Sequence, residues 1–287
     1  PMTTTKTIKV SVAKGHLLTL GEQLYTESIE LIRELVHNAY DADATDVHVT
    51  IAPDHIVVED NGSGMNEHGL TQFFTVGSDE KRKNKLSPRF GRARIGQFGI
   101  GKFAALAVAK QFAIETQKGG WVYRVIFDRD AWREQEAWEL PIVREPATPL
   151  HREGPRVTLT KLTKTFATRD VERFLKEAVP LRTKKFSVFL NQKRITAGYT
   201  QGRHTPINIK TIFGPIDGEI IVAIIPQHRL GIECRVKQAL ITRELFGLEG
   251  KHHAGIPRLA GSVNADWLPI TASRTDFIRD STEYNMF

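Results

Sequence analysis

The sequence predicts an α+β sandwich, with helices layered on one face of a mixed, mainly antiparallel sheet. Two observations lead to this fold class. An amphipathic helix pattern is followed by a β-hairpin pattern, and a second helix pattern is followed by a run of strand patterns. Of the 287 residues, 40% are hydrophobic and 25% are charged, which is ordinary for a soluble globular protein with room for two domains.

The first elements follow from the spacing of apolar residues. Residues 6–12 alternate as a strand does, and residues 22–40 place apolar side chains on one stripe of a helix. Residues 46–51 and 55–60 flank a turn and predict a hairpin. Residues 66–95 predict a short helix and then a polar, basic segment, which we interpret as a long mobile lid.

The later elements begin with a glycine-rich turn and a predicted helix over residues 101–110. Strands are predicted over residues 111–116, 121–127 and 156–162, with a loop rich in Glu, Arg and Pro before the last of them. A helix near residues 169–179 and a hairpin over residues 186–195 close the first unit. Residues 198–206 predict a linker, and strand patterns resume beyond it.

These boundaries give a first domain over residues 1–197 and a smaller, strand-rich domain over residues 206–287. Cys234 is the single cysteine, and we predict it to be a small buried side chain on a strand rather than a nucleophile. One cysteine excludes an intrachain disulfide framework and fits a reducing cytoplasm. The N-terminus has no apolar signal core, and no stretch is long and apolar enough for a membrane span. The net charge of +7 suits a polyanionic partner, nucleotide phosphates or solubility alone.

A first motif lies in the predicted helix, in the segment ELVHNAYDAD. Glu34 and Asn38 are four positions apart, so a helix places both side chains on one face. A carboxylate there can accept a proton from an attacking water, and an amide oxygen can coordinate a hard cation. The alternative is a solvated Glu and Asn on an amphipathic helix, which is the more common case for such a pair taken alone.

A second motif, VVEDNGSGMN, follows the predicted hairpin. A strand pattern ends in Asp60, and Gly62 and Gly64 allow tight bends after it. A buried carboxylate at a strand end needs a hydrogen-bond donor such as an exocyclic amine. The alternative is an ordinary Asp-Asn-Gly turn between strands.

A third motif combines glycines with the start of a helix. Gly96, Gly99 and Gly101 lead directly into the predicted helix, whose free amides and positive dipole end favour phosphate. Gly96, Gly101 and Lys102 match most of a P-loop pattern, but Phe103 stands where Ser or Thr must ligate magnesium. The pattern therefore disfavours a P-loop enzyme and retains phosphate binding by the turn. Lys102 either neutralises phosphate or simply begins a helix.

The order and spacing of these motifs resemble the GHKL superfamily, which includes gyrase, heat shock protein 90 chaperones, histidine kinases and MutL. The resemblance covers about the first two-thirds of the chain strongly and the last third more loosely. IGQFGIGKF is similar to the chaperone form of the motif, and LPITASRTDFI resembles the middle segment of heat shock protein 90 and MORC ATPases. The resemblance implies a Bergerat-type ATP-binding sandwich followed by a smaller transducer-like domain. Family members are longer than this chain, so truncation of that second domain is left open.

The resemblance also implies a role for each motif residue, with ATP or ADP and Mg²⁺ as ligands. Glu34 corresponds to the general base, Asn38 to the magnesium ligand and Asp41 to the acidic residue that follows them. Asp60 corresponds to the carboxylate that reads adenine. The other residues implied to contact nucleotide are Gly62, Gly64 and Met65 at the base, and Gly96, Gly99, Gly101, Lys102 and Phe103 at the phosphates.

Two further positions bear on the resemblance. Arg274 occupies the position from which the second domain reaches the γ-phosphate, where a guanidinium can bridge phosphate oxygens; the alternative is an ordinary surface arginine. The usual Gly-Thr pair of the fourth motif is Gly154 and Pro155 here, so its hydroxyl is missing. Thr158 lies at an odd offset from Pro155 and is expected on the opposite face of the strand.

We expect surface or structural roles for the basic residues of the lid and for the histidines. We predict that the cations of the lid are solvated, with contact to DNA phosphates as the less favoured alternative. These cations are Lys81, Arg82, Lys83, Lys85, Arg89, Arg92 and Arg94. The histidines at 16, 37, 252 and 253 show no metal-ligand spacing, so we expect structural or surface roles and no zinc site.

The expected function is Mg-dependent ATP binding and hydrolysis by a chaperone-like, heat shock protein 90-like ATPase. Lid closure and dimerisation through residues 1–21 would act as its conformational switch. One alternative is a DNA-associated clamp that resembles MORC or MutL, favoured by the basic charge and by residues 268–278. A histidine kinase ranks last, because it needs a phosphoacceptor helix for which the short N-terminus leaves no room. The client and the pathway are not fixed by the sequence.

Overall fold

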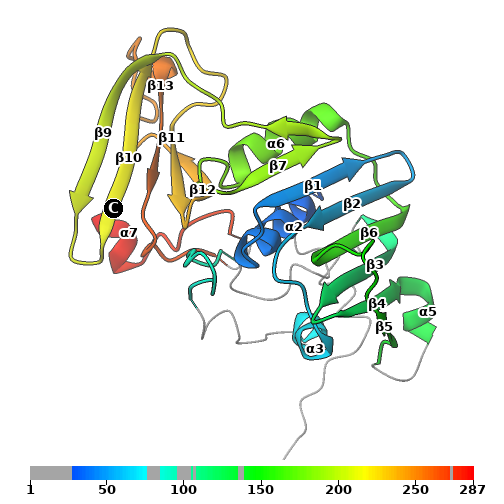
Figure 1. Ribbon diagram of the computed structural model, residues 1–287. Coiled ribbons are helices and arrows are strands. Elements are labelled where there is room, and N and C mark those ends of the chain that lie inside the picture. The colour runs from blue at the N-terminus through cyan, green and yellow to red at the C-terminus, as the bar shows by residue number, and fades with distance from the viewer. Residues whose placement is uncertain (1–27, 76–84, 96–104, 106–107, 135–138, 272–273) are drawn as a thin grey trace, which may run out of the picture.

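The computed structural model describes residues 28–75, 85–95, 105, 108–134, 139–271 and 274–287 (Figure 1). The first eight strands are β1 (Asp46–Ile51), β2 (His55–Asp60), β3 (Ala109–Lys118), β4 (Trp121–Asp128), β5 (Ile142–Pro146), β6 (Gly154–Leu162), β7 (Ser187–Leu190) and β8 (Lys193–Ile195). They form one sheet in the order β5-β4-β3-β6-β2-β1-β7-β8. Neighbouring strands of this described sheet pair antiparallel, except for β1 and β7, which pair in parallel.

Two helices share one core with this sheet. They are α2 (Glu30–Asp41) and α6 (Thr168–Ala178), and their apolar side chains join those of β1, β2, β3, β6 and β7 in a single buried cluster. The stripe on α2 includes Ile32 and Val36, which are fully buried. The short helices α3 (Glu67–Phe74) and α5 (Arg129–Glu134) lie toward the β3–β4–β5 end of the sheet (Figure 1). The predicted fold class, helices on a mixed and mainly antiparallel sheet, is confirmed.

A second sheet with its own core stands beside the first (Figure 1). Its strands are β9 (Gly202–Lys210), β10 (Pro215–Ala223), β11 (Ile232–Val236), β12 (Ala239–Glu244) and β13 (Leu259–Asn264), in the order β12-β11-β13-β10-β9. A turn of η2 (Ile256–Arg258) precedes β13, and α7 (Thr282–Met286) ends the chain. Cys234 lies on β11 and is completely buried, as predicted. The strand patterns expected beyond residue 206 include β10, β11 and β12.

Several predicted boundaries are wrong. Residues 28 and 29 form a turn before α2, while the first part of the pattern over residues 22–40 lies outside the described residues. Residues 109 and 110 belong to β3 rather than to a preceding helix. The Glu-, Arg- and Pro-rich loop contains α5 and β5, because Trp132 packs into the core and β5 pairs with β4. Residues 202–206, predicted as linker, begin β9. The predicted strand over residues 6–12 lies outside the described residues.

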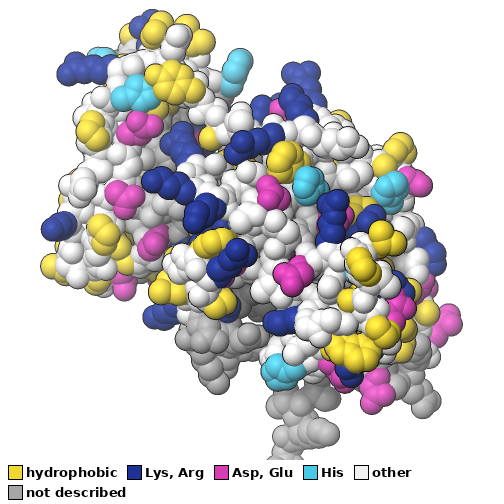
Figure 2. Space-filling view, viewed as in Figure 1, with side chains coloured by type: hydrophobic (Ala, Val, Ile, Leu, Met, Phe, Trp, Pro, Cys, Tyr) yellow, Lys and Arg dark blue, Asp and Glu magenta, His cyan; other side chains and the backbone are white. Residues whose placement is uncertain are grey.

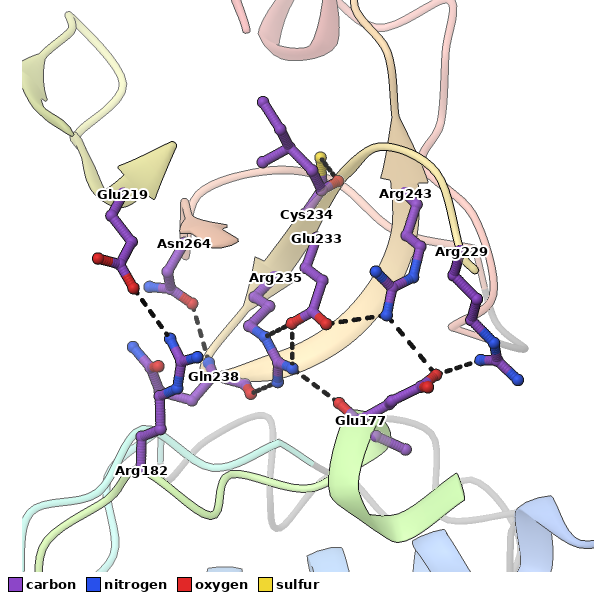
Figure 3. A network of polar contacts seen from close by, with 12 residues as sticks. Glu177, Arg182, Glu219, Arg229, Glu233, Cys234, Arg235, Gln238, Arg243 and Asn264 are labelled. Atoms are coloured by element: carbon purple, nitrogen blue, oxygen red, sulfur yellow. Dashed lines mark hydrogen bonds and ion pairs between the residues drawn. The ribbon is translucent and has the colours of Figure 1, made fainter. Parts of the chain in front are cut away.

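Helix α6 connects the two sheets through its last turn (Figure 3). The Glu177 carboxylate pairs with Arg229 and with Arg243 (3.6 Å), and the Glu177 carbonyl accepts from Arg235 Nη2 at 2.7 Å. Arg235 and Arg243 both donate in turn to Glu233, at 2.6 and 2.9 Å. These contacts hold the second sheet beside α6, and the chain after β13 returns to α2 (Figure 1). Within the described ranges, no helix is long and apolar enough to cross a membrane.

Candidate functional site

Helix α2 carries the three polar residues of the first motif. Glu34 is 5% exposed and Asp41 is 3% exposed, and Asn38, one turn after Glu34, is half-buried. One side of the helix packs on the first sheet, and residues of the second domain reach its polar residues. The Glu34 and Asn38 pair therefore lies in an enclosed position and not on a solvated helix surface.

Arg274, from the second domain, reaches Glu34 directly. Its Nη2 donates to Glu34 Oε2, and its Nη1 donates to the Ile95 carbonyl at 3.2 Å. Arg274 is 7% exposed and has a φ of 57°, a left-handed conformation that residues other than glycine seldom adopt. The alternative of an ordinary surface arginine is therefore wrong. The two residues predicted to be catalytic form a buried ion pair between the domains.

Asp60 lies where the apolar core of the first sheet ends. Ile56 and Val58 precede it on the same face of β2, and both are buried against α2 and its neighbours. Asp60 itself is 8% exposed, and its Oδ1 accepts the Gly62 amide at 2.8 Å. Burial raises the pKa of Asp60 to about 7, and nearby Glu59 adds to the effect, while the Gly62 hydrogen bond opposes it. In the described part of the chain, Asp60 Oδ2 has no hydrogen bond. A hydrogen-bond acceptor on a buried residue is therefore available at this end of the sheet.

The turn after Asp60 is tied to the end of α2. Ser63 N donates to the Ala42 carbonyl at 2.9 Å, and a Cβ added to Gly62 would lie only 2.7 Å from the same oxygen. Only glycine therefore fits this approach without a shift of the backbone. The contact brings the Asp60 turn and the polar end of α2 together, which the sequence motifs predicted separately.

The same turn is held from the other side by β3, through a residue that the sequence interpretation missed. Gly64 has a φ of 58°, and a Cβ there would lie 2.1 Å from the Gln117 carbonyl. The next residue, Met65, donates its amide to Thr116 Oγ1 at 2.8 Å. Thr116 is 1% exposed and pairs in register with Pro155 on β6. Its hydroxyl therefore lies one strand beyond the proline that replaces the expected threonine, on the face that carries Asp60.

Thr116→Val is expected to lower the free energy of unfolding by about 1–3 kcal/mol, because the half-buried Met65 amide loses its acceptor. Thr158→Val is the matched control, since Thr158 pairs with Ala113 and so lies on the opposite face of the sheet. Urea denaturation of both variants checks this. Equal midpoints for the Thr116 variant and the parent would show that the turn does not depend on the hydroxyl.

Residues 85–95 are anchored to the end of α2. Asp41 Oδ1 accepts the Ile95 amide at 2.7 Å, and Asp43 Oδ2 accepts the Arg89 amide at 2.7 Å. Arg92 is 6% exposed and donates Nη1 to the carbonyls of Tyr40 (3.1 Å) and Ala44 (2.8 Å). Arg92 also donates Nη2 to the Lys185 carbonyl at 2.9 Å. The prediction of a solvated cation is wrong for Arg92, which ties the segment before the glycine turn to the core.

Arg92→Lys is expected to destabilise the fold by about 2–4 kcal/mol, because one ammonium cannot span the carbonyls that the planar guanidinium reaches. The guanidinium also lies over the rings of Tyr40 and Phe186, at 4.7 and 5.4 Å. Thermal denaturation checks the expectation, with Arg89→Lys as the exposed control from the same segment. An Arg92→Lys protein as stable as the Arg89→Lys control would contradict this expectation.

The remaining predicted nucleotide contacts are those of the glycine turn. Gly96, Gly99, Gly101, Lys102 and Phe103 lie outside the described residues, as do residues 1–21. A second-domain residue that was not predicted, Lys237, donates its Nζ to the Arg94 carbonyl at 2.7 Å, immediately before that stretch. Burial lowers the pKa of Lys237. No local sequence signal could reveal this lysine, because 143 positions separate it from Arg94.

Comparison with known proteins places this site in a family. Residues 25–160 match the family model described as Histidine kinase-, DNA gyrase B-, and HSP90-like ATPase. This part of the chain, just under half of it, is similar to GHKL ATPases. The match contains α2 with Glu34, β2 with Asp60 and the glycine turns between them and β6. The predicted resemblance is confirmed for this GHKL domain.

Individual relatives carry different names. The "Putative type II restriction enzyme HgiDII" of Herpetosiphon aurantiacus is 36% identical over 113 residues, which cover 39% of this chain and 18% of that protein. "Chaperone protein HtpG" of Orientia tsutsugamushi is 29% identical over 149 residues, covering 40% of this chain and 22% of the relative. HtpG of Salinispora arenicola is 26% identical over 174 residues, covering 51% and 26%. The chain thus matches about a fifth to a quarter of these proteins' lengths.

Proposed function

We propose that this chain binds MgATP beside α2 and the end of the first sheet, and hydrolyses it. The observation that carries the proposal is the Asp60 turn, where a buried carboxylate keeps one oxygen available and the turn is bonded to the end of the helix that carries Glu34. A GHKL domain over residues 25–160 supports a nucleotide as the ligand.

The predicted site residues have separate roles in the proposed mechanism. Asp60 Oδ2 accepts a hydrogen bond from the exocyclic amine of adenine. Gly62, Gly64 and Met65 border the base. Glu34 orients water and accepts its proton as the water attacks the γ-phosphate. Arg274 leaves Glu34 and neutralises charge on the transferred phosphoryl group. The glycines at 96, 99 and 101, with Lys102 and Phe103, contact the phosphates.

Magnesium fits the site only together with the nucleotide. Among the described residues, no cluster of three or more His, Cys, Asp or Glu side chains could hold a metal ion. Mg²⁺ prefers oxygen ligands and is commonly bound by one or two side chains plus substrate phosphates. Asn38, half-buried one turn beyond Glu34, would supply the protein oxygen. Bound there, the ion would neutralise phosphate charge.

Titration of the protein with MgATP, MgADP and MgGTP in a calorimeter tests the proposal. We expect saturable binding of both adenine nucleotides and release of phosphate from ATP. GTP should bind far more weakly, because guanine presents a carbonyl oxygen where adenine presents an amine, and two acceptors would then face each other. Absence of adenine-nucleotide binding would overturn the proposed function.

We propose further that ATP contacts close the lid and shift the second domain. The Arg274–Glu34 pair and the Lys237–Arg94 contact support this, because both join the second domain to the candidate phosphate end. A ligand that takes Arg274 from Glu34 would change how the domains are held together. Dimerisation on ATP binding and a chaperone-like, cytoplasmic role are the accompanying expectations, supported by the similarity to HtpG.

A DNA-associated clamp is the second candidate, and a groove between α6 and the second sheet favours it. The groove has a volume of about 820 Å³. Three of its arginines are well exposed: the Arg173, Arg182 and Arg229 side chains are 57%, 58% and 53% exposed, while Glu177 and Glu233 are 20% and 18% exposed. Figure 2 shows Lys and Arg side chains gathered where the two sheets meet. The name of HgiDII, a putative restriction enzyme, agrees with this candidate.

A gel-shift titration with DNA tests the clamp. A shift that weakens steeply with salt would support DNA binding, and no shift at low salt would remove this candidate.

A further inference from the structure

Three buried polar atoms around Glu34 have no hydrogen-bond partner in the described part of the chain. They are Arg33 Nε, Glu34 Oε1 and His37 Nδ1. Arg33 Nε lies 3.7 Å from Glu34 Oε1, and His37 Nδ1 lies 3.9 Å from the same oxygen. Both distances are too long for a hydrogen bond. The three side chains are only 6%, 6% and 3% exposed, so bulk water does not reach them freely.

The donor and acceptor character of each atom follows from its other contacts. His37 Nε2 lies 3.3 Å from the Ala178 carbonyl, which can only accept, so Nε2 carries the proton. With Nε2 carrying the proton of the neutral imidazole, Nδ1 is an acceptor. Arg33 Nε is a donor, and Glu34 Oε1 is an acceptor.

One donor and two acceptors around a common space match the bonding capacity of one water molecule. A water can accept from Arg33 Nε and donate to Glu34 Oε1 and His37 Nδ1. Beside Arg33 and His37 lies a cavity of about 10 Å³, which Arg274 also lines. That volume is on the scale of a single water, and two arginines beside it disfavour a cation.

We propose that Arg33, Glu34 and His37 hold one ordered water, and that His37 positions the Glu34 carboxylate through it. The second part rests on the proposed function, in which Glu34 is the general base. The ordered water then fixes Glu34 Oε1. Glu34 Oε2 is the oxygen that releases Arg274 and binds the attacking water. His37 is a positioning residue, since it reaches the reacting atoms only through Glu34.

Two substitutions of His37 separate this role from packing. Gln places its amide nitrogen where Nε2 lies, so His37→Gln keeps the bond to Ala178 and loses the Nδ1 acceptor. Asn places its oxygen where Nδ1 lies, so His37→Asn keeps the acceptor and loses the bond to Ala178. We expect His37→Gln to lower kcat for ATP at least about tenfold with an unchanged KM, because the base is misplaced. His37→Asn should keep kcat within about twofold of the parent, although its melting temperature falls. An equal loss of kcat in both variants would overturn the positioning role.

A crystal structure of the nucleotide-free protein tests the water directly. We expect a water within about 3 Å of all three atoms in the parent, and none there in His37→Gln. An empty site in a parent structure that shows other internal waters would overturn the proposal. This measurement does not depend on catalysis. A parent protein that shows the water and hydrolyses no ATP would therefore refute the proposed function and leave the water site standing.

Discussion

Glu34→Gln is expected to slow ATP hydrolysis by about 10²–10⁴-fold while ATP affinity stays within about threefold of the parent. The amide has nearly the shape of the carboxylate, but it cannot accept the proton of an attacking water. Its carbonyl oxygen can still accept from Arg274, which donates to Oε2 in the parent. Phosphate release under saturating MgATP measures the rate, and calorimetric titration measures the affinity.

Glu34→Gln separates the loss of the base from a loss of stability better than Glu34→Ala does. Glu34→Ala would also abolish hydrolysis, but it would leave Arg274 buried without its carboxylate, at a cost of about 3–5 kcal/mol. Loss of activity could then come from unfolding. Glu30→Gln is the matched control, because Glu30 lies one turn earlier on α2, is 8% exposed and pairs with Arg33 at 2.8 Å. Normal turnover by Glu34→Gln would refute the assignment of Glu34 as the base.

Local pattern was enough to predict the parts of the site that one segment carries. The α2 stripe, the β1–β2 hairpin and the position of Asp60 at a strand end each depend on spacing within a few residues. The family resemblance then assigned roles to Glu34 and Asp60, and the family model confirms the GHKL domain that contains them. The roles of the individual residues remain predictions that the substitutions above and below test.

Features that depend on sheet register or on distant carbonyls could not be predicted. Thr116 joins the site only because β3 pairs with β6 in the register that sets it opposite Pro155. Arg92 appeared to be one cation in a basic run, yet its acceptors lie on Tyr40, Ala44 and Lys185, far away in the chain. The helix α5 and strand β5 were missed because their segment is polar and short, and pairing with β4 rather than periodicity defines the strand. In each case tertiary contacts override the local pattern.

Asp60→Asn is expected to weaken ATP binding at least about 100-fold. The Gly62 amide donates to Oδ1 in the parent, and the Asn carbonyl oxygen can keep that bond. The amide nitrogen then occupies the place of Oδ2, where it faces the amine of adenine, so two donors oppose each other. Calorimetric titration with MgATP measures the loss. Asp54→Asn, on the exposed turn of the β1–β2 hairpin with 85% of the side chain accessible, is the control and should bind normally.

The same substitution is expected to stabilise the nucleotide-free protein at alkaline pH. Burial raises the pKa of Asp60 from 3.8 to about 7. Below about pH 4 the carboxyl is protonated in the folded and the unfolded chain, so ionisation makes no difference to stability there. Between pH 4 and pH 7 the unfolded chain releases a proton that the folded chain retains, and stability falls by up to about 4 kcal/mol in total. Asn is neutral throughout, so Asp60→Asn should gain most over the parent at pH 8 and little at pH 4.

Measured together, binding and stability separate a functional carboxylate from a structural one. Replacing a residue that stabilises the fold lowers the free energy of unfolding. Replacing Asp60 is predicted to raise it, because the buried carboxylate destabilises the folded chain. Urea denaturation at pH 5 and pH 8, without nucleotide, gives the pH dependence. A variant that is more stable at pH 8 and does not bind ATP would show that the sheet end retains a costly buried carboxylate for its ligand. A variant that is more stable and still binds ATP would refute Asp60 as the adenine-reading residue.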